Sequence, residues 1–239
     1  MKRRLINQET GELEDKSVIK SVTIDCVIFG FQDGKLEVLL IKHALGIKKG
    51  EWGLPGGWIK KEEGIDLAAN RLLKELTGLG DIYLEQLKAF GDPNRFPEGR
   101  IITIGYYALI NKEKYDIKAG FTASEASWFK LEEVPELIYD HNEILNFSLE
   151  KLRHRVKHAP IGFNLLPEKF TLLQLMQLYE EIMGLKMDKP NFRRKFLKMK
   201  LLVDLKEKEK NVSHRAAKLY KFDDKVYQKL TQRGFSFEF

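Results

Sequence analysis

The stretch GGWIKKEEGIDLAANRLLKELTGL, Gly56–Leu79, decides the fold of this chain. Its glycine pair permits a left-handed backbone or the close approach of another segment. Four leucines recur at helical spacing after this pair, and a glycine follows where a helix takes its C-terminal glycine. These leucines are Leu67, Leu72, Leu73 and Leu76. The stretch therefore predicts a strand end, a glycine turn and one amphipathic helix that stops at Gly78.

The same stretch resembles the Nudix box, which runs from a glycine through a glutamate to an arginine-led helical segment and a second glycine. The residues that fit this pattern are Gly57, Glu63, Arg71, Leu73, Glu75, Gly78 and Leu79. Leu72 and Leu76 depart from it, because the family has a glutamate at each of these positions. The resemblance implies a mixed α/β (α+β) fold, the Nudix-type α/β/α sandwich. It also implies a family chemistry in which the box carboxylates hold divalent metal against a diphosphate.

The two leucines bear directly on metal binding. Residues 72, 75 and 76 lie three and four positions apart, so their side chains share one helix face. Magnesium prefers carboxylate oxygens together with substrate phosphates, and an isobutyl group offers no ligand. Glu63 and Glu75 therefore leave at most a weak magnesium site, with Arg71 as a further remnant of the box. We expect no catalytic residue and no required cofactor, with magnesium relevant only to residual hydrolase activity.

The composition is that of a globular protein with one large domain or two ordinary ones. The chain has 239 residues, of which 43% are hydrophobic and 32% are charged. Its single cysteine, Cys26, excludes an intramolecular disulfide and fits a reducing compartment. The sequence contains no apolar run of membrane length and no signal-peptide pattern. It therefore predicts a cytoplasmic protein with no membrane partner.

Positive charge is concentrated near the C-terminus. The net charge of the chain is +6, yet Lys186–Lys221 alone contains 13 basic and 4 acidic residues. A basic block on a slightly acidic body indicates a segment that meets an anion, although a solvated surface is the ordinary explanation of a charge run. The order of elements in this block decides between the two.

The C-terminal pattern predicts a winged helix-turn-helix. The chain breaks near Pro160, and a helix capped by Thr171 then runs to Met183. Asp188 caps a second, basic helix after a short turn. Residues 201–205 and 216–222 form a hairpin with a charged tip. We therefore expect residues 1–158 to form the first domain and residues 159–239 to form a DNA-binding domain.

The second helix carries the donors that read base edges and phosphates, since asparagine pairs with adenine and arginine with guanine. The hairpin tip is placed to reach a flanking groove or the backbone. Structured RNA is an alternative partner. The candidate DNA-contacting residues are Thr171, Asn191, Arg193, Arg194, Lys195, Lys198, Ser213, His214, Arg215 and Lys218.

The N-terminal domain offers candidate ligand-binding residues on its predicted strands and loops. Asp25 lies in an apolar strand, so its carboxylate either pairs with a cation or faces a pocket. The charged loop Gly91–Arg100 borders the next strand. Residues 139–141 are expected only in surface or capping roles, because three adjacent side chains point apart. The ligand candidates are Asp25, Lys42, Trp52, Gly57, Arg95, Phe96, Glu98, Arg100 and Tyr106.

A degenerate Nudix domain followed by a winged helix resembles the Nudix-related transcriptional regulators. Two segments, GFNLLPEKFTLLQL (Gly162–Leu175) and MDKPNFRRKFLKM (Met187–Met199), look most like the arabinose-responsive sugar regulators of Bacteroidetes. The resemblance implies a homodimer that binds operator duplex DNA and senses a pentose or an ADP-ribose-like effector. The rival hypothesis is a Nudix hydrolase that acts on a nucleoside diphosphate derivative such as ADP-ribose.

Overall fold

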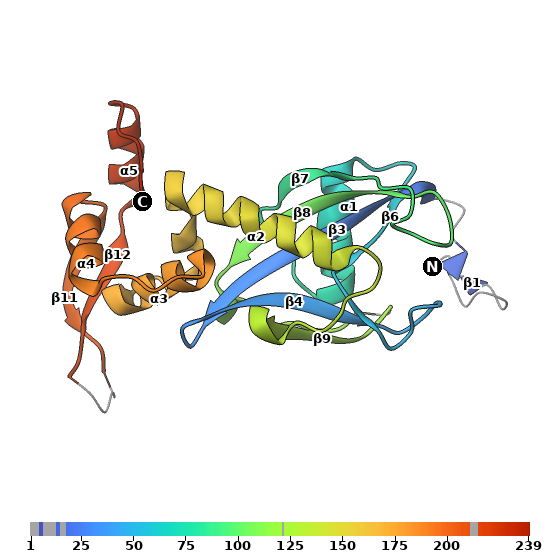
Figure 1. Cartoon of the computed structure of the whole chain (residues 1–239), viewed down its shortest axis with the longest axis horizontal. Helices are drawn as coiled ribbons and strands as arrows, with labels where there is room; N and C mark the ends of the chain where they lie inside the picture. The colour runs from blue at the N-terminus through green and yellow to red at the C-terminus, as the bar shows by residue number, and fades with distance from the viewer. Residues whose placement is uncertain (1–4, 7–12, 15–17, 121, 211–214) are drawn as a thin grey trace. The chain divides into compact units, whose positions relative to one another are not determined.

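A computed structural model describes residues 5–6, 13–14, 18–120, 122–210 and 215–239 (Figure 1). The chain divides into two compact units, one of Met1–Gly30 with Glu37–Ser148 and one of Phe31–Leu36 with Leu149–Phe239. Within the described residues, no helix combines the length and the apolar character needed to cross a bilayer.

A seven-stranded mixed sheet forms the centre of the first unit. Its strands run in the order β5-β4-β3-β8-β7, with β6 paired to β3 and β9 to β4. Strands β3 and β8 are parallel, whereas the β3–β6, β4–β5, β4–β9 and β7–β8 pairs are antiparallel. The strands are β3 (Val18–Gln32), β4 (Lys35–His43), β5 (Trp52–Gly53), β6 (Gly56–Lys60), β7 (Glu85–Phe90), β8 (Ile102–Ile110) and β9 (Ala123–Lys130). Separately, β1 (Leu5–Ile6) pairs with β2 (Leu13–Glu14).

Helix α1 (Ile65–Thr77) is the predicted Nudix-box helix, and it packs its buried face on this sheet. Gly78 ends it in the left-handed conformation, with φ of 76°, as its sequence position predicts. Leu72 and Leu76 are buried, but Leu67 is 69% exposed, so the prediction that it shares their face is wrong. Five residues turn a helix by about 140° beyond one full turn, which carries Leu67 away from Leu72.

The glycine pair is required for close packing rather than for a left-handed backbone. Neither Gly56 nor Gly57 has a positive φ. A Cβ atom on Gly56 would lie 2.1 Å from Oδ1 of Asp25, and one on Gly57 would lie 2.8 Å from Cδ2 of Leu72. The pair therefore lets strand β6 approach both β3 and α1.

Helix α2 (His141–His158) begins in the first unit, where its start and α1 lie on opposite sides of the sheet (Figure 1). Two short 3-10 turns, η1 (Lys112–Lys114) and η2 (Leu131–Glu133), complete this part of the chain.

The second unit has the predicted helices and hairpin. Thr171 caps α3 (Leu172–Met183), and Asp188 caps α4 (Lys189–Lys198). Strand β12 lies between β10 and β11. The remaining elements are η3 (Pro160–Leu165), β10 (Phe170–Thr171), β11 (Leu202–Lys208), β12 (Lys218–Phe222) and α5 (Asp224–Thr231), the last of which the sequence pattern did not predict.

Aromatic rings fill the centre of the second unit. Tyr179 and Phe196 are fully buried, with ring centroids 5.2 Å apart. The C-terminal residues join this cluster, because Phe237 is buried and the ring of Phe239 lies 4.3 Å from that of Tyr179. The amide of Phe239 also donates to the carbonyl of Lys157 at 2.8 Å. The core thus fixes the inner faces of α3 and α4 and leaves the outer face of α4 to solvent.

Candidate ligand pocket and nucleic-acid interface

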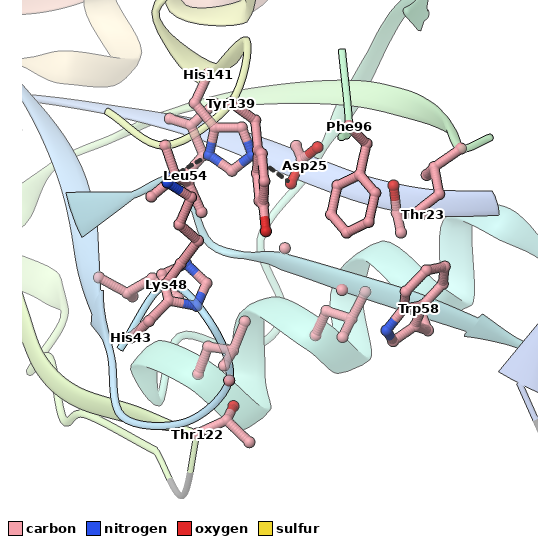
Figure 2. Close-up of a pocket in the computed structure, with 18 of the residues that line it drawn as sticks. Thr23, Asp25, His43, Lys48, Leu54, Trp58, Phe96, Thr122, Tyr139 and His141 are labelled. Carbon is pink, nitrogen blue, oxygen red and sulfur yellow. Dashed lines mark hydrogen bonds and ion pairs between the residues drawn. The ribbon is translucent and has the colours of Figure 1, made fainter. Parts of the chain in front are cut away.

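A cavity of about 300 Å³ opens in the first unit (Figure 2). Strand β3, the segment after β4, the glycine pair, α1 and the residues just before α2 all contribute to its lining. Three aromatic side chains, Trp58, Phe96 and Tyr139, stand around it. An aromatic wall with a few polar groups is typical of a small-molecule site.

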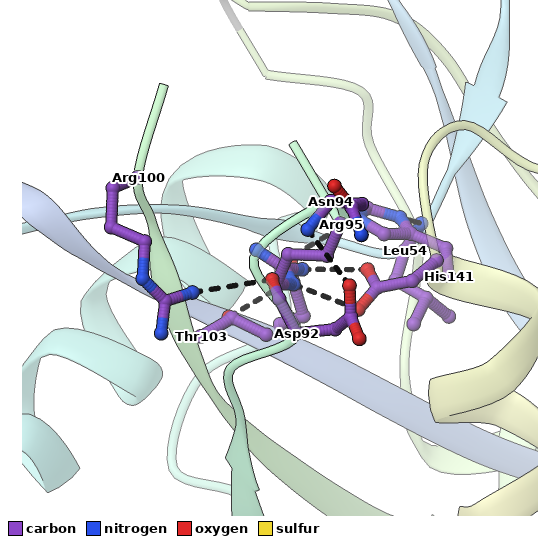
Figure 3. A network of polar contacts seen from close by, with 9 residues as sticks. Leu54, Asp92, Asn94, Arg95, Arg100, Thr103 and His141 are labelled. Carbon is purple, nitrogen blue, oxygen red and sulfur yellow. Dashed lines mark hydrogen bonds and ion pairs between the residues drawn. The ribbon is translucent and has the colours of Figure 1, made fainter. Parts of the chain in front are cut away.

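A buried polar network lies at one side of this cavity (Figure 3). The guanidinium of Arg95 donates two hydrogen bonds to Asp140, at 2.6 and 2.7 Å. Its Nη2 lies 3.6 Å from Oδ2 of Asp25, which also accepts a 2.7 Å hydrogen bond from Thr103. The sequence left two roles open for Asp25, pairing with a cation or facing a pocket. In the structure Asp25 both pairs with Arg95 and lines the cavity.

His141 joins the same network as a neutral ring. Its Nδ1 accepts a 2.9 Å hydrogen bond from the amide of Leu54, and its Nε2 lies 3.6 Å from Oδ1 of Asp25. Burial lowers the pKa of His141, more than the nearby carboxylates raise it. Burial likewise lowers the pKa of His43, whose Nε2 has no hydrogen-bond partner among the residues that the structure describes. Two histidines of the pocket wall are therefore built to remain uncharged.

Acidification is expected to destabilise the first unit. The unfolded chain protonates His141 near its ordinary pKa of about 6.5, whereas the folded chain resists this until a lower pH. The stabilisation is thus complete above about pH 6.5 and is lost as the pH falls through the folded pKa. Urea unfolding between about pH 8 and pH 5 measures this slope. In His141→Asn, whose side-chain oxygen accepts the same amide, the slope should be shallower, and an equal slope would contradict this assignment.

The Nudix-box face is apolar where a metal would bind. Leu72 and Leu76 line the cavity beside Glu75. Glu63 is engaged elsewhere, since both of its oxygens accept hydrogen bonds from Arg71. Arg71 lowers the pKa of Glu63, and this pair raises the pKa of Arg71 in turn. In the described part of the chain, no three His, Cys, Asp or Glu side chains gather as metal ligands. These residues do not fit the divalent metal of an active Nudix box.

Four of the predicted ligand-binding residues line the cavity, namely Asp25, Gly57, Arg95 and Phe96. The other five lie outside the cavity. Three of them, Lys42, Trp52 and Tyr106, are strand residues whose side chains point to the sheet face away from the cavity, because successive side chains of a strand alternate between faces. Lys42 and Trp52 are paired in register and contact each other, whereas Ile41 and His43 face the cavity. The remaining residues are Tyr106, Glu98 and Arg100.

Tyr106 pairs with Cys26, on the opposite sheet face from Asp25, and its hydroxyl hydrogen-bonds Asp66 at 2.5 Å. Glu98 is exposed outside the cavity. Arg100 is exposed as well, and it donates to the carbonyls of Gly91 and Asp92 (Figure 3). The two loop residues therefore brace or flank their own loop rather than reach the ligand site.

Sequence reasoning missed the segment just before α2. Tyr139 and His141 both line the cavity, and Asp140 between them binds Arg95. The expectation of surface or capping roles is therefore wrong. It failed because Tyr139 has a left-handed backbone, with φ of 52°, which a sequence pattern does not disclose. His43 and Lys48 were missed as well, and the alternation of β4 predicts the inward direction of His43.

The outer face of α4 is the candidate nucleic-acid interface. Asn191, Arg193, Arg194, Lys195 and Lys198 are all exposed, while Phe192 and Phe196 face the core. Nη2 of Arg194 lies within hydrogen-bond distance of Oδ1 of Asn191. The described ends of the hairpin add Arg215, which is exposed, and Lys218, which pairs with Asp204 at 3.0 Å.

Three of the predicted DNA contacts need comment. Thr171 is buried, and its hydroxyl accepts a hydrogen bond from the amide of Gln174 at 3.1 Å. This capping role is incompatible with a direct DNA contact, so the prediction for Thr171 is wrong. Ser213 and His214 lie outside the described residues.

Two protein families match the chain. Residues 20–148 match the family described as NUDIX domain. Residues 162–222 match the family described as NrtR DNA-binding winged helix domain. All of the cavity-lining residues belong to the first match, and α4 belongs to the second.

Individual relatives match different shares of the chain. The chain is 33% identical over 205 residues to the ADPR responsive transcriptional repressor NtrR of Acinetobacter baylyi, covering 84% of this chain and 81% of that protein. It is 34% identical over 125 residues to the ADP-ribose pyrophosphatase of Methanocaldococcus jannaschii, covering 52% and 70%. The crystal structure of Shewanella oneidensis NrtR complexed with a 27mer DNA has a TM-score of 0.71 at 28% identity, covering 84% of this chain and 93% of that one. The similarity to the regulators thus extends over both units.

Proposed function

The chain belongs to the NrtR family of Nudix-related transcriptional regulators, and from that premise we propose that it is a ligand-responsive regulator that no longer hydrolyses its ligand. The observation that carries the proposal is the pairing, in one chain, of an apolar Nudix-box face at Leu72 and Leu76 with an exposed basic face on α4. The first feature removes metal ligands, and the second supplies donors for DNA.

In this proposal residues 1–158 sense the effector and residues 159–239 bind operator duplex DNA. A homodimer places two α4 helices about one DNA turn apart, which matches a palindromic operator. The protein then works in the cytoplasm, where its operator lies. A coupling of roughly 1–3 kcal/mol between effector and operator would change operator affinity about 5- to 150-fold.

The effector that we propose carries a pentose ring, either within ADP-ribose or as a free sugar. The name of the Acinetobacter relative supports ADP-ribose. The cavity adds a constraint, because its arginines are already paired with carboxylates, Arg95 with Asp140 and Arg71 with Glu63. A diphosphate would then rely on Lys60 and on Lys48, which also line the cavity, although Lys48 pairs with the exposed carboxylate of Glu51 at 3.3 Å. A free pentose, as in the arabinose-responsive branch, would need only hydrogen bonds and the aromatic wall, and it stays a prediction.

The deciding experiment is binding of the purified full chain to its own upstream intergenic DNA. It is run at moderate salt with excess competitor DNA, alone and with ADP-ribose, D-ribose, D-xylose or L-arabinose. A specific complex that one of these ligands weakens or strengthens would support the regulator and identify its effector. Retention that depends only on salt, or an equal preference for structured RNA, would refute operator recognition.

The regulator and the rival hydrolase hypothesis differ in what they predict about magnesium. A hydrolase would release AMP from ADP-ribose when magnesium is added. We expect this protein to release none, since Leu72 and Leu76 offer no metal ligand. Replacing both by glutamate should destabilise the first unit without metal, because two carboxylates are then buried. Magnesium or manganese should restore much of the loss. Urea unfolding with and without metal measures both effects.

Leu67→Glu is the matched control, because this leucine lies on the exposed side of the same helix. It should alter stability little and respond to neither metal. Product release by the unmodified protein would instead favour the hydrolase.

A further inference from the structure

The geometry points to Tyr139 as the residue that both contacts the ligand and reports its presence to helix α2. This inference rests on the proposed function, since it names how the same pocket is read. Tyr139 lines the cavity and stands between two side chains, with its ring centroid 4.6 Å from that of Phe96 and 5.6 Å from Nζ of Lys48 (Figure 2). An aromatic face at this place suits the apolar C–H face of a pentose ring.

The backbone of Tyr139 is held in a conformation that bulky residues rarely adopt. Its φ of 52° is left-handed. Among the described non-glycine residues with positive φ, Tyr139 is the one that lines the cavity. Such strained positions persist only where the surroundings over-determine them, and they gather at ligand sites and switches.

Bonds on both sides of Tyr139 supply this restraint. The amide of Ile138 donates to the carbonyl of Trp52 at 3.0 Å, which fixes the preceding residue. The following residues are fixed by the Asp140–Arg95 pair and by the hydrogen bond from Leu54 to His141. The ring is therefore aimed into the cavity by its neighbours, and a ligand that moves it must also act on these bonds.

The position of Tyr139 lets it transmit ligand binding to helix α2 in addition to contacting the ligand. Helix α2 begins only two residues later, at His141, and it is continuous through Leu149, from which point its residues belong to the second unit. A change in the φ and ψ angles of residue 139 reorients the first turn of this helix. A ligand that prefers one ring position therefore shifts the population of α2 arrangements, as any ligand with differential affinity does.

Three substitutions separate the role of Tyr139 as a ligand contact from its role in transmitting binding to α2. Tyr139→Phe keeps the ring and should preserve ligand affinity within about threefold. Tyr139→Asn accepts a left-handed backbone but has no ring, so it should bind the ligand about tenfold more weakly. Tyr139→Val opposes the left-handed backbone, so it should reduce the ligand-induced change in operator affinity at least about threefold.

The measurements are calorimetric titrations of the full chain with ADP-ribose and with the three pentoses, and operator titrations with and without each. Wild-type ligand affinity in Tyr139→Asn would contradict the contact between Tyr139 and the ligand. A wild-type effect of the ligand on operator affinity in Tyr139→Val would contradict the transmission of binding through Tyr139 to α2. If Tyr139→Val does not fold, a structure of the native protein with the bound probe decides, because an unchanged φ at Tyr139 would contradict this transmission.

The test also separates this inference from the proposed function. If the native protein binds none of the four probes, the proposal that Tyr139 contacts a pentose ring is refuted. A native protein that binds a probe but no operator refutes the regulator, while the Phe and Asn variants still decide the contact.

Discussion

Replacing Arg95 with alanine is expected to lower the free energy of unfolding of the first unit by about 3–5 kcal/mol. The side chain of Arg95 is 3% exposed and lies between two carboxylates, those of Asp140 and Asp25. Its removal would leave two buried negative charges without their cation, which costs more than the loss of the hydrogen bonds alone. The hydroxyl of Thr103 cannot neutralise the charge of Asp25, and only protonation of His141, whose Nε2 lies 3.6 Å from Oδ1 of Asp25, would offset part of the loss.

Tryptophan fluorescence during urea unfolding measures this effect in the right unit. All three tryptophans of the chain, Trp52, Trp58 and Trp128, lie in the first unit. The signal therefore reports the sheet and its cavity without a contribution from tryptophans of the second unit. A shift of the urea midpoint at constant slope would show a change in stability rather than in compactness.

Arg100→Ala is the control, since Arg100 belongs to the same loop but is exposed and donates only to backbone carbonyls. It should cost less than about 1 kcal/mol. Equal losses in the two variants would mean that the loop as a whole, and not the buried ion pair, stabilises the unit. Ligand affinity should also fall in Arg95→Ala alone, because Arg95 lines the cavity.

The parts of this fold that the sequence predicts are those with local signals. Gly78 ends α1, Thr171 caps α3 and Asp188 caps α4, each because a short-range hydrogen-bonding need selects a particular residue type. The spacing of the Nudix box predicted that the first unit has a Nudix-type fold. The apolar face at Leu72 and Leu76 followed from helix periodicity and coordination chemistry together.

The parts that it did not predict depend on distant partners or on backbone conformation. Arg95 pairs with a residue 45 positions away, Asp140, and the sequence offers several equally charged alternatives. Arg100 was as good a candidate from composition, yet it points elsewhere. The left-handed backbone of Tyr139 has no signature, since an aromatic residue there is against the usual preference.

Operator binding should depend most strongly on the outer face of α4, and Arg194→Ala is expected to cost about 1–3 kcal/mol if Arg194 contacts a base. Arg194 is the sixth of the ten residues of α4, in the middle of its exposed basic face. Its guanidinium also lies within hydrogen-bond distance of Asn191, so the two side chains are already ordered together. The measurement is the operator dissociation constant at several salt concentrations, with a random duplex measured in parallel.

Arg194→Lys separates base reading from phosphate contact, because lysine keeps the charge but lacks the planar fork that binds guanine. A base contact predicts that lysine restores little, that the salt dependence stays almost unchanged and that preference over the random duplex falls. A phosphate contact predicts that lysine restores most of the affinity and that alanine lowers the salt slope by about one. Lys229→Ala removes the same charge from α5, where Lys229 is exposed, and serves as the control. Equal losses in Arg194→Ala and Lys229→Ala would show that net charge alone retains the DNA and that α4 does not read its sequence.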